Sequence, residues 1–195
     1  LETAEPDGDR IGLHRRNALL LALGAGSFTR VVYVDFDHLL RWLENDAGEC
    51  AAVLGAAGAY DCGIIGRGPG SWAALPLRLA ATEAVVNHIY RLMTGRSWDL
   101  LMAARSLSRA AAQAIVDDCD IESIGTDVGW PLFCEARGFT VGYVVGEGLR
   151  YRTDADYARD LPDEADRDPR EWATRVRFAA QHVEAMVPFM AQISG

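Results

Sequence analysis

Apolar positions recur along the chain with two spacings, and these predict helices and strands in alternation. Apolar residues three or four positions apart predict helices at residues 12–23, 38–45, 51–59, 80–94 and 108–116, from the turn at 124–131 to residue 137, and at 168–190. Short runs rich in valine, isoleucine and tyrosine predict strands at residues 31–36, 60–65 and 140–145. At 195 residues the chain suits one α/β unit that buries a single sizeable core.

The first predicted strand runs directly into two carboxylates, in the order Val31-Val-Tyr-Val-Asp35-Phe-Asp37. Side chains of a strand alternate between its faces, so Asp35 and Asp37 are expected to point the same way. Two carboxylates at the carboxyl end of a strand suit a hard divalent cation such as Mg²⁺ or Mn²⁺. If Asp37 only caps the next helix, Asp35 is left without a reason, because a buried unpaired acid is costly. We therefore predict a metal site at Asp35 and Asp37.

Another acidic residue, Asp127, lies in a turn before a helix, where it is either an N-cap or a catalytic base. Gly125 and Gly129 flank it and would let a substrate approach closely. Trp130 offers the flat apolar surface on which sugars stack. If burial raises the pKa of Asp127 toward neutrality, its carboxylate can accept a proton from a substrate. Asp127 is therefore a candidate general base, and Gly125 and Trp130 are candidate acceptor contacts.

The last helix has a clear start signal, in which Asp168 is a capping residue, Pro169 is in the first turn and Glu171 follows. An apolar stripe on this helix is expected to pack on the body of the protein or on a partner chain, as in a homodimer; it consists of Trp172, Val176, Ala179, Val183, Met186 and Met190. We divide the chain into a domain at residues 1–153 and a following acidic loop and helix at 154–195.

Composition narrows the possible chemistry. The net charge of −9 argues against a general nucleic-acid binder, and no apolar run is long enough to span a membrane. All 19 basic residues are arginine, which excludes a Walker phosphate loop and a Schiff-base enzyme because both need lysine. The four cysteines have no short paired spacing, which favours reduced thiols in a cytoplasmic protein over a zinc knuckle or a disulfide framework.

Taken together, these segments resemble the catalytic domain of GT-A glycosyltransferases of family 2. The stretch Gly12–Leu23, with Arg16-Asn17, resembles the family's glycine- and Arg-Asn-containing helix before the metal strand. Val31 to Asp37 resembles its strand ending in D-x-D, and Gly63 to Arg67 its strand ending in Gly-x-Arg, here without the intervening serine. Gly125-Thr126-Asp127 resembles its Glu-Asp acceptor motif, with Thr126 in place of Glu.

The resemblance implies a Rossmann-like, mixed but mostly parallel sheet flanked by helices. It implies metal-dependent transfer of a sugar from a nucleotide-diphosphate donor to an acceptor hydroxyl, with inversion. Asp35 and Asp37 would hold Mg²⁺ or Mn²⁺, and Asp127 would take the acceptor's proton. Gly12, Arg16, Asn17 and Arg67 would contact the nucleotide-sugar donor.

About 30 residues precede the metal strand, and a complete βαβ unit alone needs about that many, so the family's N-terminal base-binding strands have no counterpart in this sequence. Two other functions stay open. A haloacid-dehalogenase-type phosphatase also places D-x-D after an apolar strand, although that family usually has a downstream lysine. A non-catalytic binding or assembly module would keep the fold and lack the donor site.

Overall fold

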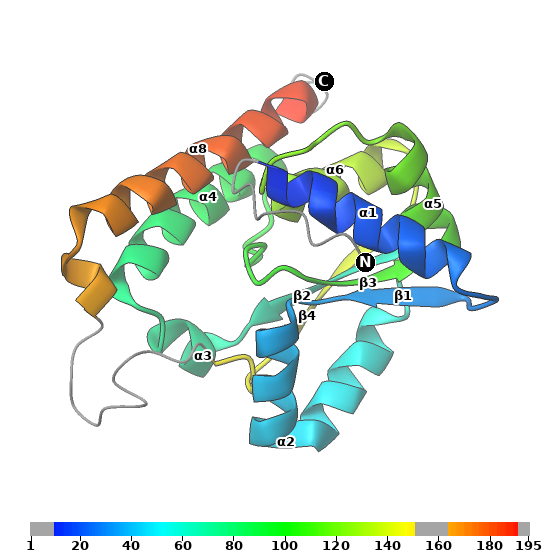
Figure 1. The fold of residues 1–195 in the computed structure, drawn as a ribbon, viewed down its shortest axis with the longest axis horizontal. Helices are drawn as coiled ribbons and strands as arrows, with labels where there is room; N and C mark the ends of the chain where they lie inside the picture. Colours follow the sequence, from blue (N-terminus) through cyan, green and yellow to red (C-terminus); the bar gives the residue numbers. More distant parts are fainter. Residues whose placement is uncertain (1–9, 151–163, 191–195) are drawn as a thin grey trace.

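The computed structural model describes residues 10–150 and 164–190, so most of the predicted acidic loop, residues 154–163, lies outside the described part. A four-stranded sheet has helices on both faces, and Figure 1 shows α1, α5 and α6 on one side of the strands and α2 on the other. The elements are α1 (Ile11–Gly24), β1 (Arg30–Tyr33), α2 (Phe36–Ala57), β2 (Cys62–Arg67), α3 (Pro69–Ala73), α4 (Leu77–Thr94), β3 (Ala104–Ser108), α5 (Arg109–Asp118), α6 (Thr126–Ala136), β4 (Val141–Gly146), η2 (Glu164–Arg167) and α8 (Pro169–Met190).

The sheet is open and mixed, with strand order β1-β3-β2-β4. β3 runs antiparallel to both of its neighbours, β1 and β2, while β2 and β4 are parallel. The expectation of an α/β fold with a helix-flanked mixed sheet is confirmed. The expectation that the sheet is mostly parallel is wrong, because two of its three pairings are antiparallel.

β3 is the strand that sequence patterning does not predict. Its residues, Ala-Arg-Ser-Leu-Ser, contain no β-branched or aromatic side chain, and Arg105 is buried in the middle of the strand. Pairing on both edges with β1 and β2 compensates for this weak intrinsic preference. The strand therefore depends on its neighbours rather than on its own sequence.

β1 is shorter than expected and α2 is longer. β1 ends at Tyr33, and α2 begins at Phe36 with Asp35 at the N-cap position in extended backbone. The helix continues to Ala57 through a kink at Asp46, so the two helices expected at 38–45 and 51–59 are halves of one bent helix. Asp35 and Asp37 are therefore not alternate residues of a strand, and the argument that placed them on one strand face is wrong.

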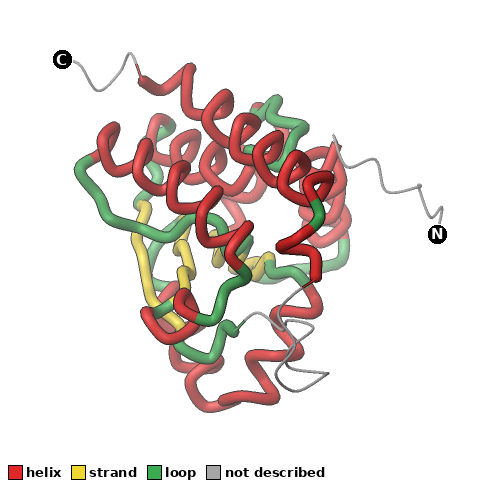
Figure 2. Tube along the Cα trace, turned by 90° about the vertical axis from the view of Figure 1, so that its left-hand side faces the viewer, coloured by secondary structure: helices red, strands yellow, loops and turns green. Residues whose placement is uncertain are grey.

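Buried side chains form three clusters around the central strand β2, whose residues are all buried. Cys62 and Ile64 face the clusters built with α1, α4, α5, α6 and α8, while Ile65 faces the cluster built with α2. A strand buried on both faces reads as a continuous apolar run, as this one does. Figure 2 shows the strands between α2 and the other helices.

The C-terminal helix α8 lies along α4 and also packs on α6 of the same chain, as Figure 1 shows. Its buried residues are His182, Ala185 and Met186, whereas Val176 of the predicted stripe is exposed. Met186 belongs to the predicted stripe, and Ala179 and Met190 of that stripe pack against the same core cluster, so this part of the stripe faces the body of the protein. None of the helices within residues 10–150 and 164–190 combines the length and apolar character that a membrane span requires.

Candidate functional site

A cavity of about 250 Å³ opens at the edge of the sheet where β1 and β2 end. Because both strands run antiparallel to β3, their carboxyl ends meet at this edge together with the segment that leads into β3. The cavity is lined by Arg15, Asp35, Asp37, His38, Arg67, Leu79, Glu83, Leu101, Met102, Ala103, Ile124, Asp127, Leu149 and Arg175. Three arginines and four carboxylates thus share one small space.

Asp127 is at the centre of a buried network below this cavity. It lies in the first turn of α6, where a negative charge suits the helix dipole, and is 5% exposed. Its Oδ1 accepts a hydrogen bond from Arg15 Nη1 at 2.7 Å, and its Oδ2 lies 3.2 Å from Nε2 of His182. Its backbone carbonyl accepts a hydrogen bond of 2.6 Å from Arg105. The carboxylate therefore lies between the Arg15 guanidinium of α1 and the His182 ring of α8.

These partners set the charge of Asp127. Burial by itself would raise the pKa of its carboxyl, but the Arg15 charge, the His182 hydrogen bond and the Arg105 charge hold the pKa well below its usual value. The expectation that burial raises the pKa of Asp127 toward neutrality is therefore wrong. Asp127 is ionised at neutral pH and available as a proton acceptor, with little driving force as a base.

Thr126 precedes Asp127 and shares its main partner. The Thr126 hydroxyl accepts a hydrogen bond of 3.0 Å from Arg15 Nη1, and the residue is 1% exposed. A glutamate at this position would add a second negative charge beside the same guanidinium. The threonine instead contributes a neutral acceptor, so Asp127 is the charged partner of Arg15 at this end of α6.

Asp35 and Asp37 both line the cavity but differ in their surroundings. Asp35 Oδ1 accepts a hydrogen bond from the Tyr33 hydroxyl at 2.9 Å, and Oδ2 lies 3.9 Å from Arg15. The Asp37 side chain is 80% exposed and lies 3.9 Å from His38. Asp35 thus has two neighbouring partners, whereas Asp37 faces solvent at the mouth of the cavity.

The donor set at this position fits a divalent cation only in part. Among the described residues, no group of three histidine, cysteine, aspartate or glutamate side chains is close enough to hold a metal ion. Mg²⁺ is, however, commonly bound by one or two carboxylates together with substrate phosphates. Asp35 and Asp37 therefore suit an ion whose remaining ligands come from a bound phosphate, and not an ion held by the protein alone.

Arg67, at the end of β2, is buried and lines the cavity as well. Its Nε and Nη2 donate to the two carboxylate oxygens of Asp99 at 2.7 and 2.9 Å, and Nη2 also donates to Glu83. Its guanidinium stacks 4.8 Å from the ring centre of Trp72. Such a bidentate pair fixes the guanidinium plane, so Arg67 is a rigid wall of the site.

Arg67 also borders a second, more open cleft of about 680 Å³ on its other side. This cleft is lined by Arg67, Pro69, Trp72, Ala84, Asn87, His88, Arg91, Ser97, Trp98, Asp99 and Tyr143. Trp98 and Tyr143 stack nearly parallel there, with ring centres 5.5 Å apart. The cleft therefore combines aromatic rings with basic groups and is separated from the smaller cavity by Arg67.

Three of the four predicted donor contacts lie away from the cavity. Gly12 packs so closely on the segment before α6 that a Cβ there would lie 2.3 Å from the Ser123 carbonyl oxygen. Arg16 donates to the Cys119 carbonyl at 2.7 Å, and Asn17 is exposed on α1. The structure therefore does not bring Gly12, Arg16 and Asn17 to the cavity, because the face of α1 turned to the cavity carries Arg15.

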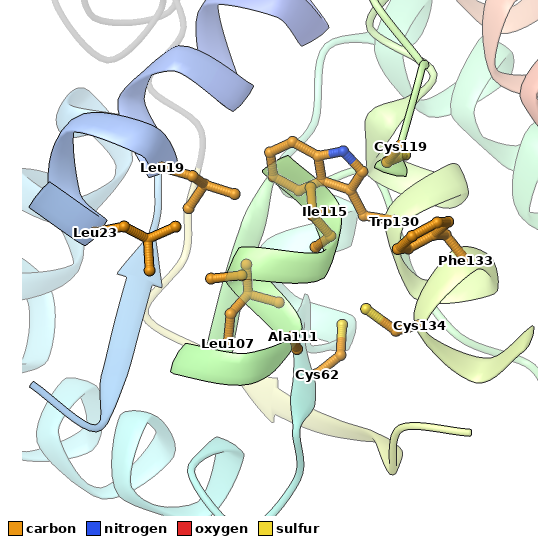
Figure 3. Packing of buried hydrophobic residues seen from close by; sticks show 11 residues of the cluster. Leu19, Leu23, Cys62, Leu107, Ala111, Ile115, Cys119, Trp130, Phe133 and Cys134 are labelled. Carbon is orange, nitrogen blue, oxygen red and sulfur yellow. The ribbon is translucent and has the colours of Figure 1, made fainter. Parts of the chain in front are cut away.

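Both predicted acceptor contacts are also in the interior. A Cβ on Gly125 would lie 2.6 Å from the Ala185 Cβ, so this glycine admits α8 rather than a substrate. Trp130 is 2% exposed in a core cluster and packs edge-on against Tyr33, with ring centres 5.8 Å apart. Figure 3 shows Trp130 among the labelled core side chains, near Ile115. The structure therefore does not bring Gly125 and Trp130, the predicted acceptor contacts, to the cavity.

Four residues of the site are not found by motif reasoning: Arg15, Glu83, Arg175 and His182. Two of them carry a recognisable signal. Arg15 is four residues before the buried Leu19, and His182 is four residues before the buried Met186. A charged or polar residue on the buried face of an amphipathic helix needs a partner, and each of these two has Asp127 as that partner.

No family model, curated protein or solved structure matches this chain. The resemblance to family 2 glycosyltransferases therefore rests on short motifs alone. Of the residues in those motifs, Asp35, Asp37, Arg67 and Asp127 meet at one cavity.

Proposed function

We propose that the cavity binds the diphosphate and sugar of a nucleotide-sugar donor, and that the protein transfers the sugar to an acceptor hydroxyl with inversion. The observation that carries this proposal is the meeting of Asp35, Arg67 and Asp127, which belong to three separate sequence motifs, around one cavity. The carboxylates of Asp35 and Asp127, the guanidinium of Arg67 and the apolar side chains that line the cavity then lie within reach of one small ligand.

Asp127 is the proposed proton acceptor. As the acceptor oxygen bonds to the anomeric carbon, the bond from that carbon to the diphosphate oxygen breaks and the hydroxyl proton passes to the carboxylate. Oδ1 of Asp127 accepts a hydrogen bond from Arg15, Oδ2 lies 3.2 Å from Nε2 of His182, and each oxygen has a lone pair left for the acceptor hydroxyl. The low pKa of Asp127 keeps it ionised for this step.

The leaving diphosphate needs positive charge. A Mg²⁺ or Mn²⁺ ion held by Asp37 and Asp35 together with the phosphates would stabilise the charge that develops on the leaving group. The two hydrogen bonds to Asp99 hold the guanidinium plane of Arg67 in place, so that Arg67 forms a fixed wall against which the donor lies. The cavity of about 250 Å³ is smaller than typical ligand pockets, so we place the rest of the substrates in the larger cleft beyond Arg67.

Calorimetric titration with UDP and with GDP, each with Mn²⁺, tests the binding step. We expect heat with at least one nucleotide, and a free energy of unfolding raised by about 2.7 kcal/mol at a hundredfold excess over Kd. Because the proposed protein ligands of the ion are only Asp35 and Asp37, Mn²⁺ alone should bind much more weakly than Mn²⁺ with the nucleotide.

The reaction is tested by following nucleotide release from UDP- and GDP-sugars. Asp127→Asn should reduce turnover at least about 100-fold while leaving nucleotide binding within a few fold, provided it is assayed below its own unfolding temperature. Hydrolysis of p-nitrophenyl phosphate that is lost in Asp35→Asn, without any turnover of nucleotide-sugars, would favour a phosphatase instead. Absence of heat with every nucleotide would favour a non-catalytic module.

A further inference from the structure

Arg175 differs from the other two arginines of the cavity in its partners. Arg15 is paired with Asp127, and Arg67 is paired with Asp99 and Glu83. Within residues 10–150 and 164–190, Arg175 makes no hydrogen bond or ion pair, and its guanidinium lies 5.8 Å from the ring centre of Phe178. The third cation of the cavity is thus not committed to a carboxylate of the described chain.

The fold, and not chance exposure, places Arg175 at the cavity. It precedes the buried His182 by two helical turns on α8, so the two residues share one face of the helix. His182 in turn contacts Asp127, which fixes this face of α8 against the first turn of α6. The helix therefore presents Arg175 beside Asp127 and Glu83, with which it lines the cavity.

The cavity needs a further positive charge once a diphosphate enters it. Its own carboxylates are Asp35, Asp37, Glu83 and Asp127, of which Asp127 is paired with Arg15 and Glu83 with Arg67. A diphosphate adds negative charge beside these carboxylates, and like charges within a few ångströms repel strongly. Burial raises the pKa of Glu83 while the charges of Arg67 and Arg175 lower it, which places the Arg175 charge near this carboxyl.

We propose that Arg175 binds the diphosphate group of the donor, so that the C-terminal helix is part of the donor site. The inference rests on the proposed function, since it assumes that a nucleoside diphosphate occupies the cavity. The guanidinium fork matches phosphate oxygens and forms two charge-assisted hydrogen bonds at once, which an ammonium group does not. A phosphate would thereby be the ion-pair partner of Arg175, which has no such partner among the carboxylates of the described residues.

The test compares UDP and GDP binding to the full chain carrying Arg175→Gln or Arg177→Gln, by calorimetry with Mn²⁺ and again with EDTA. Arg177 is the matched control, since it is on the same helix and 6.0 Å from the same Phe178 ring but does not line the cavity. Arg175→Gln should weaken binding about tenfold in Mn²⁺ and remove any binding that persists in EDTA. Arg177→Gln should change it less than twofold, and Arg175→Lys should recover part of the loss.

The outcomes separate this inference from the proposed function. If the unchanged protein binds nucleotide and Arg175→Gln binds it equally well, the role of Arg175 is overturned while the proposed function stands. Equal losses in the Arg175 and Arg177 variants also overturn it, because a general charge effect would then suffice. If the unchanged protein binds no nucleoside diphosphate, the proposed function fails and takes the inference with it. Melting temperatures of the three variants show whether each is folded.

Discussion

Replacing Asp127 by asparagine should destabilise the protein because it leaves the Arg15 guanidinium buried beside a neutral group. The Arg15 side chain is 8% exposed and donates a 2.7 Å hydrogen bond to Asp127. Breaking a buried ion pair from one side typically costs about 3–5 kcal/mol. Asparagine keeps an acceptor oxygen and Asp35 stays 3.9 Å away, so we expect the low end, about 3 kcal/mol. For a chain of this size that is a fall in Tm of about 6–12 °C.

The contribution of Asp127 to the free energy of unfolding depends on pH in a definite direction. The folded protein holds the pKa of Asp127 below its usual value of 3.8, so around pH 4 the unfolded chain binds more protons than the folded one. The contribution of Asp127 to the free energy of unfolding is therefore complete above about pH 5 and declines as the pH falls through 4 and below. The difference between the unchanged protein and Asp127→Asn should shrink over the same range.

Urea unfolding followed by tryptophan fluorescence measures the free energy of unfolding and its dependence on pH, since Trp130 is three residues from Asp127 in the core. Asp37→Asn is the control: its side chain is 80% exposed, and it should change the free energy by about 0.5 kcal/mol or less. The double variant Arg15→Met/Asp127→Asn should lose less free energy of unfolding than the two single variants lose together, because neither buried charge is then left without its partner. A loss below about 0.5 kcal/mol in Asp127→Asn, or a difference that grows on acidification, would refute the reasoning.

Further substitutions test the packing of α8 and the wall of the cavity. Gly125→Ala should destabilise the protein by about 1–3 kcal/mol, since its Cβ would lie 2.6 Å from a side-chain atom of α8. Gly55→Ala, with open space around its helical position, should stabilise the protein by about 0.5–1 kcal/mol. Thermal unfolding compares the two variants, and equal effects would contradict the packing argument. Arg67→Lys should cost about 2 kcal/mol in urea unfolding because lysine cannot bind Asp99 bidentately, whereas the exposed Arg91→Lys should be neutral; a neutral Arg67→Lys would show that the fork geometry is unimportant.

Local patterning determines several elements of this protein. The apolar run of β2 and the periodicity of α4 identify these elements, and the capping signal at Asp168 and Pro169 marks the start of α8. Patterning misses β3 because its stability comes from two neighbouring strands and not from its own side chains. It also misplaces the end of β1, since Asp35 and Phe36 suit a helix start as well as a strand end.

In the candidate site, too, the local sequence indicates some residues and the tertiary structure adds others. The sequence by itself draws attention to Asp35, Asp37 and Asp127, because acids after an apolar strand or in a turn need a reason for being there, while Arg67 is indicated only by the resemblance to a family motif. Only the tertiary structure brings Arg15 and His182 to Asp127, and these long-range partners reverse the expected direction of its pKa shift. Burial and charge pairing depend on residues distant in the chain, which no local pattern records. The sequence thus determined which carboxylates are candidates, and the packing of α1 and α8 against Asp127 decided its charge state.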